Sequence, residues 1–299
     1  MNRLLTPKQI AQALGVSESS LKRWCDRGLL PIERTPGGHR RIPLEAAVDF
    51  VRRSGRAVVQ PDLLDLPAAI GTGPTVMDRA RDQFCEALAE ADEARATRIV
   101  FDLYLGRHPI SEIGDRVIAG AFHQIGDKWS CGELDVYEER RACELAGRIL
   151  HQIRGVMPPP PTAAPLALGG TALGDEYHLP TMLVELSLRE CGWRAESCGS
   201  SLPLESLAAA VRRYRPKLAW LSVSAIADEA SFLAGFAELS SAAEDQGVAL
   251  VVGGRALGES LRGRLSYAAH CDTLRQLVTL AAALHPPAKK AKRSKAARS

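Results

Sequence analysis

The hydrophobic positions divide the chain into three segments, each with its own periodicity. In residues 1–57, short apolar stripes flank a turn at 15–17, and this spacing predicts a helix, a tight turn and a second helix. Residues 75–155 carry long stripes at helical spacing with few Gly or Pro, which is typical of an antiparallel four-helix bundle. From 165 to 286, apolar runs alternate with helical patterns, so we expect a doubly wound parallel sheet.

The individual elements follow from the same pattern. The bundle helices are expected at 76–91, 93–105, 110–127 and 134–154. The strands of the sheet are expected at 165–168, 194–197, 218–223, 249–252 and 267–269. The helices of this segment are expected at 181–191, 204–214, 229–246, 255–262 and 273–284. Residues 54–74 and the Pro-rich stretch 156–165 are expected to be linkers.

The N-terminal segment has the signals of a small DNA-binding unit. Thr6 is a suitable N-cap for a first helix with Pro7 at its first position, and a second helix starts from Ser17 or Ser19. Extended runs around 36–38 predict a hairpin, and a third helix is expected at 43–53. This is the helix-turn-helix pattern, whose second helix enters the major groove of DNA. The expected DNA contacts are Ser19, Ser20, Lys22 and Arg23 on the second helix, and Arg34, His39, Arg40 and Arg41 on the hairpin.

The distribution of charge along the chain agrees with a DNA partner. The net charge is +3, but residues 1–57 carry 11 Lys and Arg against 5 Asp and Glu, and residues 286–299 carry 6 Lys and Arg with no acid. The stretch between them is therefore acidic. Basic ends indicate a polyanion at the ends and a different task in the middle. The tail 287–299 is expected to be disordered and to add salt-sensitive affinity for DNA.

The composition also indicates where in the cell the protein is expected. There is no apolar run of about 18 residues, so we expect no membrane segment, and the N-terminus lacks the apolar core of a signal peptide. The 7 Cys form no C-x-x-C pair. Together these features predict a cytoplasmic protein with reduced thiols.

One loop of the C-terminal segment carries candidate chemistry. His178 follows Glu176 by two residues, between the first expected strand and the helix after it. Loops at this place in an open α/β sheet hold ligand sites. His178 is therefore a candidate metal ligand with a carboxylate to orient it, and an ordinary loop or capping His is the alternative.

Residues 6–53 resemble the winged helix-turn-helix domain of the MerR family. The resemblance rests on residues 14–17, 21–24 and 28–30 and on the hairpin 34–41 taken together. It implies a transcription regulator that binds a double-stranded DNA operator. A related winged-helix module that binds protein is the alternative.

The middle segment resembles the helical bundle of light-sensing, adenosylcobalamin-binding regulators of the CarH/LitR type. Trp129 and Glu139 match the W-x9-E-H pattern of that family, where these residues cover the upper face of the corrin. Arg140 stands where the family has His, and Ser130 stands where some members carry the His that binds cobalt after light removes the adenosyl group. His123 is a weaker substitute for that imidazole.

The C-terminal segment is similar to the flavodoxin-like, Rossmann-type domain that binds cobalamin in this family. By the resemblance, His178 would bind the cobalt from below, and Glu176 or Asp175 would orient it. Ser222, Ser224, Gly253 and Gly254 would contact the buried nucleotide tail of the cofactor. Thr181 stands in place of the family's loop Gly, where the tail threads, so the site is expected to be narrowed, reshaped or lost.

The sequence thus predicts a multidomain chain: a winged helix-turn-helix at 1–57, a four-helix bundle at 75–155, an α/β domain at 165–286 and a basic tail at 287–299. We expect a non-enzymatic regulator that binds DNA and cobalamin in its adenosyl form and that forms a dimer or tetramer. Two alternatives stay open. The C-terminal half would sense another ligand or only mediate self-association or protein binding, or the chain would be a corrinoid carrier for methyl transfer, which the helix-turn-helix disfavours.

Overall fold

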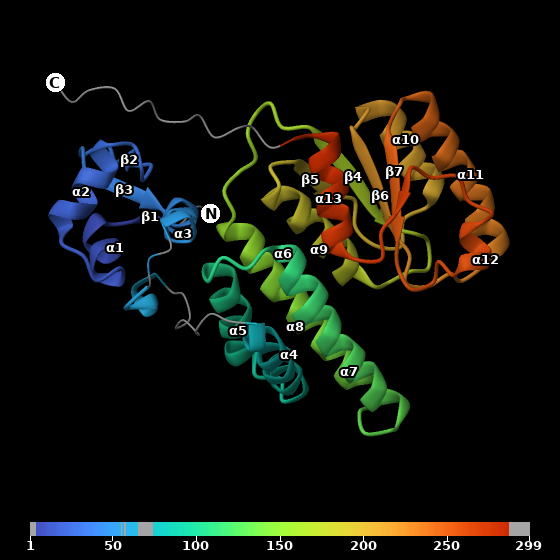
Figure 1. Cartoon of the computed structure of the whole chain (residues 1–299), viewed down its shortest axis with the longest axis horizontal. Helices are drawn as coiled ribbons and strands as arrows, with labels where there is room; N and C mark the ends of the chain where they lie inside the picture. The colour runs from blue at the N-terminus through green and yellow to red at the C-terminus, as the bar shows by residue number, and fades with distance from the viewer. Residues whose placement is uncertain (1–3, 55, 57, 65–73, 287–299) are drawn as a thin grey trace.

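The computed structural model describes residues 4–54, 56, 58–64 and 74–286. Figure 1 shows three neighbouring bodies: the N-terminal elements, a helical bundle and a sheet flanked by helices. Most of the expected linker 54–74 and all of the basic tail 287–299 lie outside the described residues. No helix of the described part is long and apolar enough to cross a membrane.

The N-terminal elements form the predicted winged helix-turn-helix. Their bounds are β1 (Leu4–Leu5), α1 (Pro7–Ala13), α2 (Glu18–Asp26), β2 (Glu33–Arg34), β3 (Arg40–Pro43) and α3 (Leu44–Ser54). Thr6 caps α1 in a capping box with Gln9, and the Ser17 side chain accepts the backbone N–H of Ser20 at the start of α2. β3 pairs antiparallel with β2 in the wing and with the short β1, which the hydrophobic pattern does not predict.

The bundle contains the expected four helical runs. They are α4 (Pro74–Ala89), α5 (Glu93–Leu105), the continuous run α6 (Ile110–Glu112), η2 (Ile113–Ile118) and α7 (Ala119–Ser130), and α8 (Val136–Val156). η2 is a π-helical segment, a feature that often lies at functional sites. The third run ends at Ser130 rather than at 127. α8 begins at Val136 rather than at 134 because Asp135 caps it in a capping box with Glu138.

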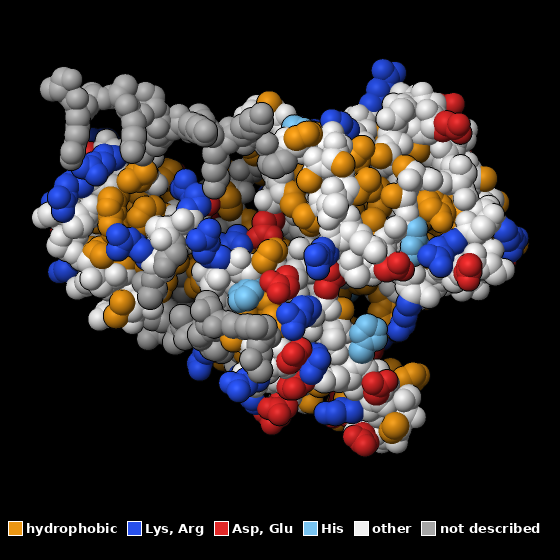
Figure 2. Space-filling view, in the orientation of Figure 1, with side chains coloured by type: hydrophobic (Ala, Val, Ile, Leu, Met, Phe, Trp, Pro, Cys, Tyr) orange, Lys and Arg blue, Asp and Glu red, His pale blue; other side chains and the backbone are white. Residues whose placement is uncertain are grey.

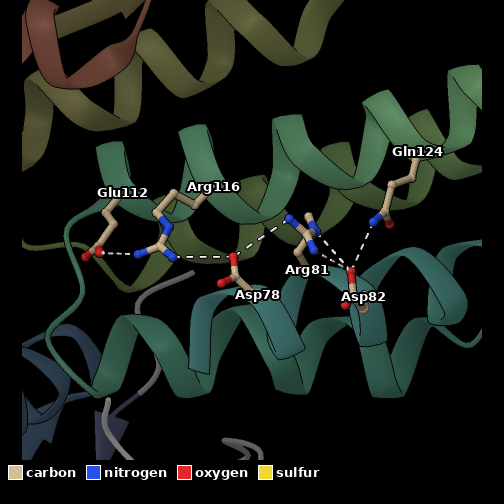
Figure 3. Close-up of polar contacts among 6 residues, drawn as sticks. All are labelled: Asp78, Arg81, Asp82, Glu112, Arg116 and Gln124. Carbon is tan, nitrogen blue, oxygen red and sulfur yellow. Dashed lines mark hydrogen bonds and ion pairs between the residues drawn. The ribbon is translucent and has the colours of Figure 1, made fainter. Parts of the chain in front are cut away.

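A chain of polar contacts ties α4 to the run η2–α7 on the outer side of the bundle (Figure 3). Asp78 binds Arg116 of η2 at 3.4 Å, and Asp82 accepts from Gln124 of α7 at 3.0 Å. Arg81 lies between the two carboxylates, and its side chain passes over Gly120, where a Cβ would be 2.8 Å away. Gly120 therefore permits the close approach of α4 and α7.

The C-terminal segment is a five-stranded parallel sheet in the order β5-β4-β6-β7-β8. This is the flavodoxin-like order of the doubly wound fold, as predicted. The strands are β4 (Leu166–Thr171), β5 (Arg194–Ser197), β6 (Leu218–Ser222), β7 (Ala249–Gly253) and β8 (Ala269–His270). The helices are α9 (His178–Glu190), α10 (Leu204–Tyr214), α11 (Glu229–Asp245), α12 (Glu259–Arg262) and α13 (Leu274–Leu284).

Three of these bounds differ from the expectation. α9 begins at His178 instead of 181, so His178 belongs to the first helical turn and not to a loop. α12 begins only at Glu259, because Gly254 has a φ of +119° and residues 254–258 form turns. β8 is shorter and later than the expected 267–269.

Alternation along β6 divides the helices between the two faces of the sheet. Leu218 and Trp220 pack with α9 and α13, whereas Ala219 and Leu221 pack with α10 and α11. The bundle lies against the α9–α13 face (Figure 1). Any site between the bundle and the sheet must therefore form at α9, α13 and the strand ends nearest to them.

The bundle docks on this face at two glycines. Gly114 of η2 lies against Leu274, where a Cβ would be 2.4 Å from the side chain. Next to it, Asp115 accepts the backbone N–H groups of Leu274 and Arg275 at 2.9 and 3.1 Å and so satisfies the first turn of α13. On the other side, the ring of His178 lies over Gly147 of α8, where a Cβ would be 2.8 Å from Nε2.

Candidate functional site

A cavity of about 630 Å³ lies between the bundle and the α/β domain. This volume is within the range of small-molecule and cofactor sites, which is about 300–1,000 Å³. Its walls come from η2, α7 and α8 on one side, and from α9, α13 and the carboxyl ends of β6 and β7 on the other. The carboxyl ends of the strands are where ligands bind in this fold class.

One face of the run η2–α7 and one face of α8 form the part of the cavity that we call the outer chamber. Its bundle residues follow helical spacing and are Ile118, Ala119, Phe122, His123, Gly126 and Trp129 from η2–α7, and Val136, Glu139, Arg140 and Cys143 from α8. Trp129 is 53% exposed although it borders the cavity, so one side of this chamber is open to solvent. The predicted Trp129, Glu139 and Arg140 are thus brought to one wall.

A thiol and a carboxylate are coupled on that wall. Cys143 donates to Glu139 Oε1 at 3.4 Å, and Arg140 lies 3.7 Å from the other oxygen of Glu139. Burial, with the Glu139 charge added, raises the pKa of the Cys143 thiol to about 12. Cys143 is therefore a neutral thiol and not a thiolate ligand at ordinary pH.

The predicted residues of the sheet also reach the cavity. Ser222, Ser224, Gly253 and Gly254 border it at the ends of β6 and β7. Close packing of the neighbouring backbone by itself requires glycine at positions 253 and 254. A Cβ on Gly253 would lie 2.6 Å from the Cys271 carbonyl oxygen, and one on Gly254 would lie 2.2 Å from that of Val223.

The loop before α9 presents Tyr177 to the outer chamber. Asp175 beneath it is fully buried and accepts the backbone N–H groups of Tyr177 at 3.1 Å and of Ser224 at 2.6 Å. Burial raises the pKa of the Asp175 carboxyl, and these backbone donors oppose the rise. The Tyr177 ring lies between two guanidinium groups, with Arg255 at 4.8 Å and Arg140 at 5.8 Å from its centroid.

Four predicted residues do not border the cavity. The ring of His178 lies against Gly147, and Glu176 is exposed. Asp175, the other expected partner of His178, binds backbone N–H groups instead. Thr181 is 1% exposed, and its hydroxyl accepts the indole N–H of Trp220 at 2.9 Å.

Below the strand ends the cavity continues as what we call the inner slot. Its walls are Leu183, Val184, Trp220, Val251 and Leu277. Trp220 and Val251 come two residues before the last residues of β6 and β7. The slot therefore reaches about 6–7 Å below the edge of the sheet, at about 3.3 Å per residue.

Sequence reasoning did not identify Tyr177, Asp115, Trp220 or Arg255. Trp220 lies in an apolar run and looks like an ordinary core residue. Asp115 and Arg255 meet the other elements only through the tertiary fold. Tyr177 had a local signal, because it stands directly before the candidate His178.

The candidate DNA-binding side chains lie on α2 and the wing. Ser19, Lys22, Arg23, Arg34 and His39 are exposed, and Figure 2 shows Lys and Arg side chains spread over the N-terminal elements. Ser20 accepts from Arg23 at 3.1 Å. Arg40 is in an ion pair with Asp26 at 2.9 Å, and Arg41 is half-buried. These two side chains are therefore less available for phosphates than the other six.

Comparison with protein-family models assigns two parts of the chain. Residues 4–54 match a helix-turn-helix domain, and residues 80–154 match a B12 binding domain. The chain is 26% identical over 288 residues to the HTH-type transcriptional repressor CarA of Myxococcus xanthus, covering 91% of this chain and 94% of the relative. It is 25% identical over 239 residues to the repressor CarH of the same organism, covering 72% and 77%.

The fold has a solved counterpart. The monomethylamine corrinoid protein of Methanosarcina barkeri superposes with a TM-score of 0.56 at 16% identity, over 70% of this chain and 98% of that chain. The chain thus combines a helix-turn-helix domain with a B12-binding domain, and its two relatives CarA and CarH are transcriptional repressors. The predicted fold class is confirmed.

Proposed function

We propose that this protein is a DNA-binding transcription regulator whose state is set by a cobalamin held between the helical bundle and the α/β domain. The observation that carries the proposal is the shared cavity of about 630 Å³, which neither domain forms alone. The helix-turn-helix unit on the same chain supplies a DNA-binding output. The repressors CarA and CarH resemble the chain over most of its length, which supports the same combination.

The volume and the lining of the cavity are compatible with a cobalamin. The outer chamber between α7, α8 and Tyr177 would take the flat corrin, and the inner slot would take the nucleotide tail. The donor set also fits. Among the described residues no group of three or more His, Cys, Asp or Glu is placed to hold a bare metal ion. A corrin would bring its own nitrogen ligands for the cobalt, so His178 alone could be the protein group that holds the metal.

His178 would be the lower axial ligand. Its ring would turn from Gly147 toward the chamber, a movement open to a half-buried side chain in the first turn of a helix. When bound in its adenosyl form, the cofactor would supply a light-cleavable cobalt–carbon bond. Ser130 is exposed and donates to the Asp127 carbonyl, so His123, which borders the chamber, is the better candidate for an upper imidazole.

Self-association would couple the ligand to DNA binding. A single helix-turn-helix unit binds DNA weakly, and pairing two units raises the affinity for a two-part operator. A dimer or tetramer held together by the bundle and the α/β domain would provide that pairing.

The test is an absorbance spectrum of the full chain reconstituted with adenosylcobalamin, in the dark and after light, with oligomeric state followed by size-exclusion chromatography. His178→Ala is expected to weaken cobalamin binding about tenfold or more through the lost axial ligand. His151→Ala, an exposed His of α8, is the matched control and should bind as wild type does. If His178→Ala binds as tightly as wild type, the axial role is wrong. If wild type shows no corrin spectrum, the cofactor is wrong.

A second function is favoured by the placement of His178 and Thr181 outside the cavity walls. In this second function the cavity would bind a ligand other than cobalamin, or the C-terminal half would only mediate self-association or protein binding. A chain without a corrin spectrum that still binds DNA as an oligomer would support it.

A further inference from the structure

The inner slot is apolar over its whole depth. Its five wall residues are hydrophobic, and Trp220, Val251 and Leu277 are almost fully buried. On the sheet side, the serine side chains that border the cavity lie at the strand ends above the slot, at Ser222 and Ser224. A ligand with a polar connecting part and an apolar end would therefore enter end first.

Trp220 is the wall residue with a polar atom, and that atom is already bonded. Its Nε1–H donates to Thr181 Oγ1 at 2.9 Å. Thr181 does not border the cavity, so the indole N–H points away from the slot. Thr181 is itself joined to Ser197 by a hydrogen bond of 3.3 Å between the two hydroxyl groups.

The backbone fixes the indole in this place. Gly169 of β4 lies directly beneath it, and a Cβ there would be 2.2 Å from the ring. Gly169 on one side and Thr181 on the other thus hold Trp220 in one orientation. As a result, the wall side chains of the slot offer an entering group no free donor or acceptor.

This chemistry discriminates between heterocycles. A base that carries an amino group and ring nitrogens loses its hydrogen bonds to water in such a slot and gains none in return. A base with methyl groups on a carbocycle loses much less and gains apolar contact. Cobamides differ in this base at the end of their nucleotide tail.

We infer that the inner slot selects cobamides by their lower base, taking a dimethylbenzimidazole and rejecting a purine, with Trp220 as the residue that determines this selection. Thr181 is its positioning residue. The inference rests on the proposed function, because it assumes that a corrinoid occupies the outer chamber. Of these two residues, Thr181 stands in place of the family's loop Gly.

The test compares the affinities of the full chain for three corrinoids: one with dimethylbenzimidazole, one with adenine and one without a nucleotide tail. Wild type is expected to prefer the benzimidazole form to the adenine form by about tenfold or more, the effect of one unpaired polar group. The tail-less corrinoid should also bind more weakly than the benzimidazole form.

Three substitutions test the residues of the slot. Val184→Thr keeps the shape of the side chain and places a hydroxyl in the slot, so the preference should fall about tenfold. Thr181→Val removes the hydrogen bond that holds the Trp220 indole in one orientation, so the ring can turn its N–H into the slot and bond a purine nitrogen, and the preference should fall similarly. Thr181→Ser keeps the acceptor and should restore the wild-type preference, which a merely structural role of Thr181 does not predict.

The results distinguish a failure of lower-base selection from a failure of corrinoid binding itself. Equal affinity of wild type for the two lower bases, or equal affinity for the tail-less corrinoid, overturns the inference. So does an unchanged preference in Val184→Thr, which also decides the matter if Thr181→Val does not fold. If none of the three corrinoids binds to wild type, the proposed function itself is wrong.

Discussion

Glu190→Ala is expected to loosen the contact between the N-terminal elements and the rest of the chain. Glu190 is the last residue of α9. Its Oε1 accepts from Arg52 of α3 at 2.7 Å, and its Oε2 accepts the backbone N–H of Ile110 at 2.7 Å. The Arg52 guanidinium also lies 3.9 Å from the centroid of the Tyr104 ring. One carboxylate therefore joins all three bodies of the protein.

The magnitude follows from burial. Both side chains of the pair are 19% exposed, so this pair is better shielded than a surface ion pair, which contributes about 0–1 kcal/mol. The substitution also leaves the Ile110 N–H without an acceptor, which costs about 1–3 kcal/mol. We expect a total of about 2–4 kcal/mol in the local opening of this contact. Glu190→Gln keeps an oxygen for Ile110 and should lose less.

Hydrogen exchange at the Ile110 amide measures this opening directly. A loss of about 2 kcal/mol corresponds to exchange about 30-fold faster. Glu196→Ala is the matched control, since its pair with Arg194 is longer at 3.5 Å and about half exposed. Exchange of Ile110 at the wild-type rate in Glu190→Ala would refute the role given to this carboxylate.

Three further predictions concern the bundle and the wing. Gly147→Ala places a methyl group 2.8 Å from His178 Nε2, so it should destabilise the protein by about 1–3 kcal/mol and alter corrinoid affinity. Gly155→Ala on the same helix meets open space and should stabilise the protein by about 0.5–1 kcal/mol. Thermal melting compares the stabilities of the two variants, and titration with a corrinoid compares their affinities. Asp102 is 2% exposed with no hydrogen-bond partner for its carboxylate, and burial raises its pKa from 3.8 to about 7. Because the pKa of Asp102 is higher in the folded than in the unfolded protein, the free energy of unfolding falls as pH rises from about 4 to about 7. Asp102→Asn should remove this fall and raise the free energy of unfolding by about 2–4 kcal/mol at pH 8. Urea unfolding at pH 5 and at pH 8 measures both effects. Arg34→Ala should lower the salt dependence of binding to nonspecific duplex DNA by about 0.9 in log–log slope if Arg34 contacts one phosphate, and an unchanged slope would exclude that contact.

The sequence predicts those parts of the fold that depend on neighbours along the chain. Thr6 with Gln9 marks the start of α1, and the apolar run at 218–222 marks a buried strand, because caps and periodicity act over a few residues. The family resemblance also points to Trp129 and Glu139, and both side chains border the cavity, Trp129 from α7 and Glu139 from α8.

The parts that the sequence could not predict depend on contacts between distant segments. The start of α9 at His178 leaves that ring over Gly147, which is 31 positions earlier in the chain. Thr181 was expected to obstruct the tail of the cofactor, yet its side chain turns to Trp220 and away from the cavity. Neither contact leaves a local pattern, because each is set by the angle at which a helix packs on the sheet or on the bundle.

α9 joins the cavity to the contact with the DNA-binding unit. Its first two turns border the cavity through Leu179, Leu183 and Val184, and its last residue holds Arg52 of the DNA-binding unit. Thirteen helical residues at about 1.5 Å each place the two ends about 20 Å apart on one stiff element. If a ligand in the cavity shifts the first turn of α9 and this shift changes the Arg52 contact, then DNA binding that depends on the same contact must change ligand affinity by the same factor.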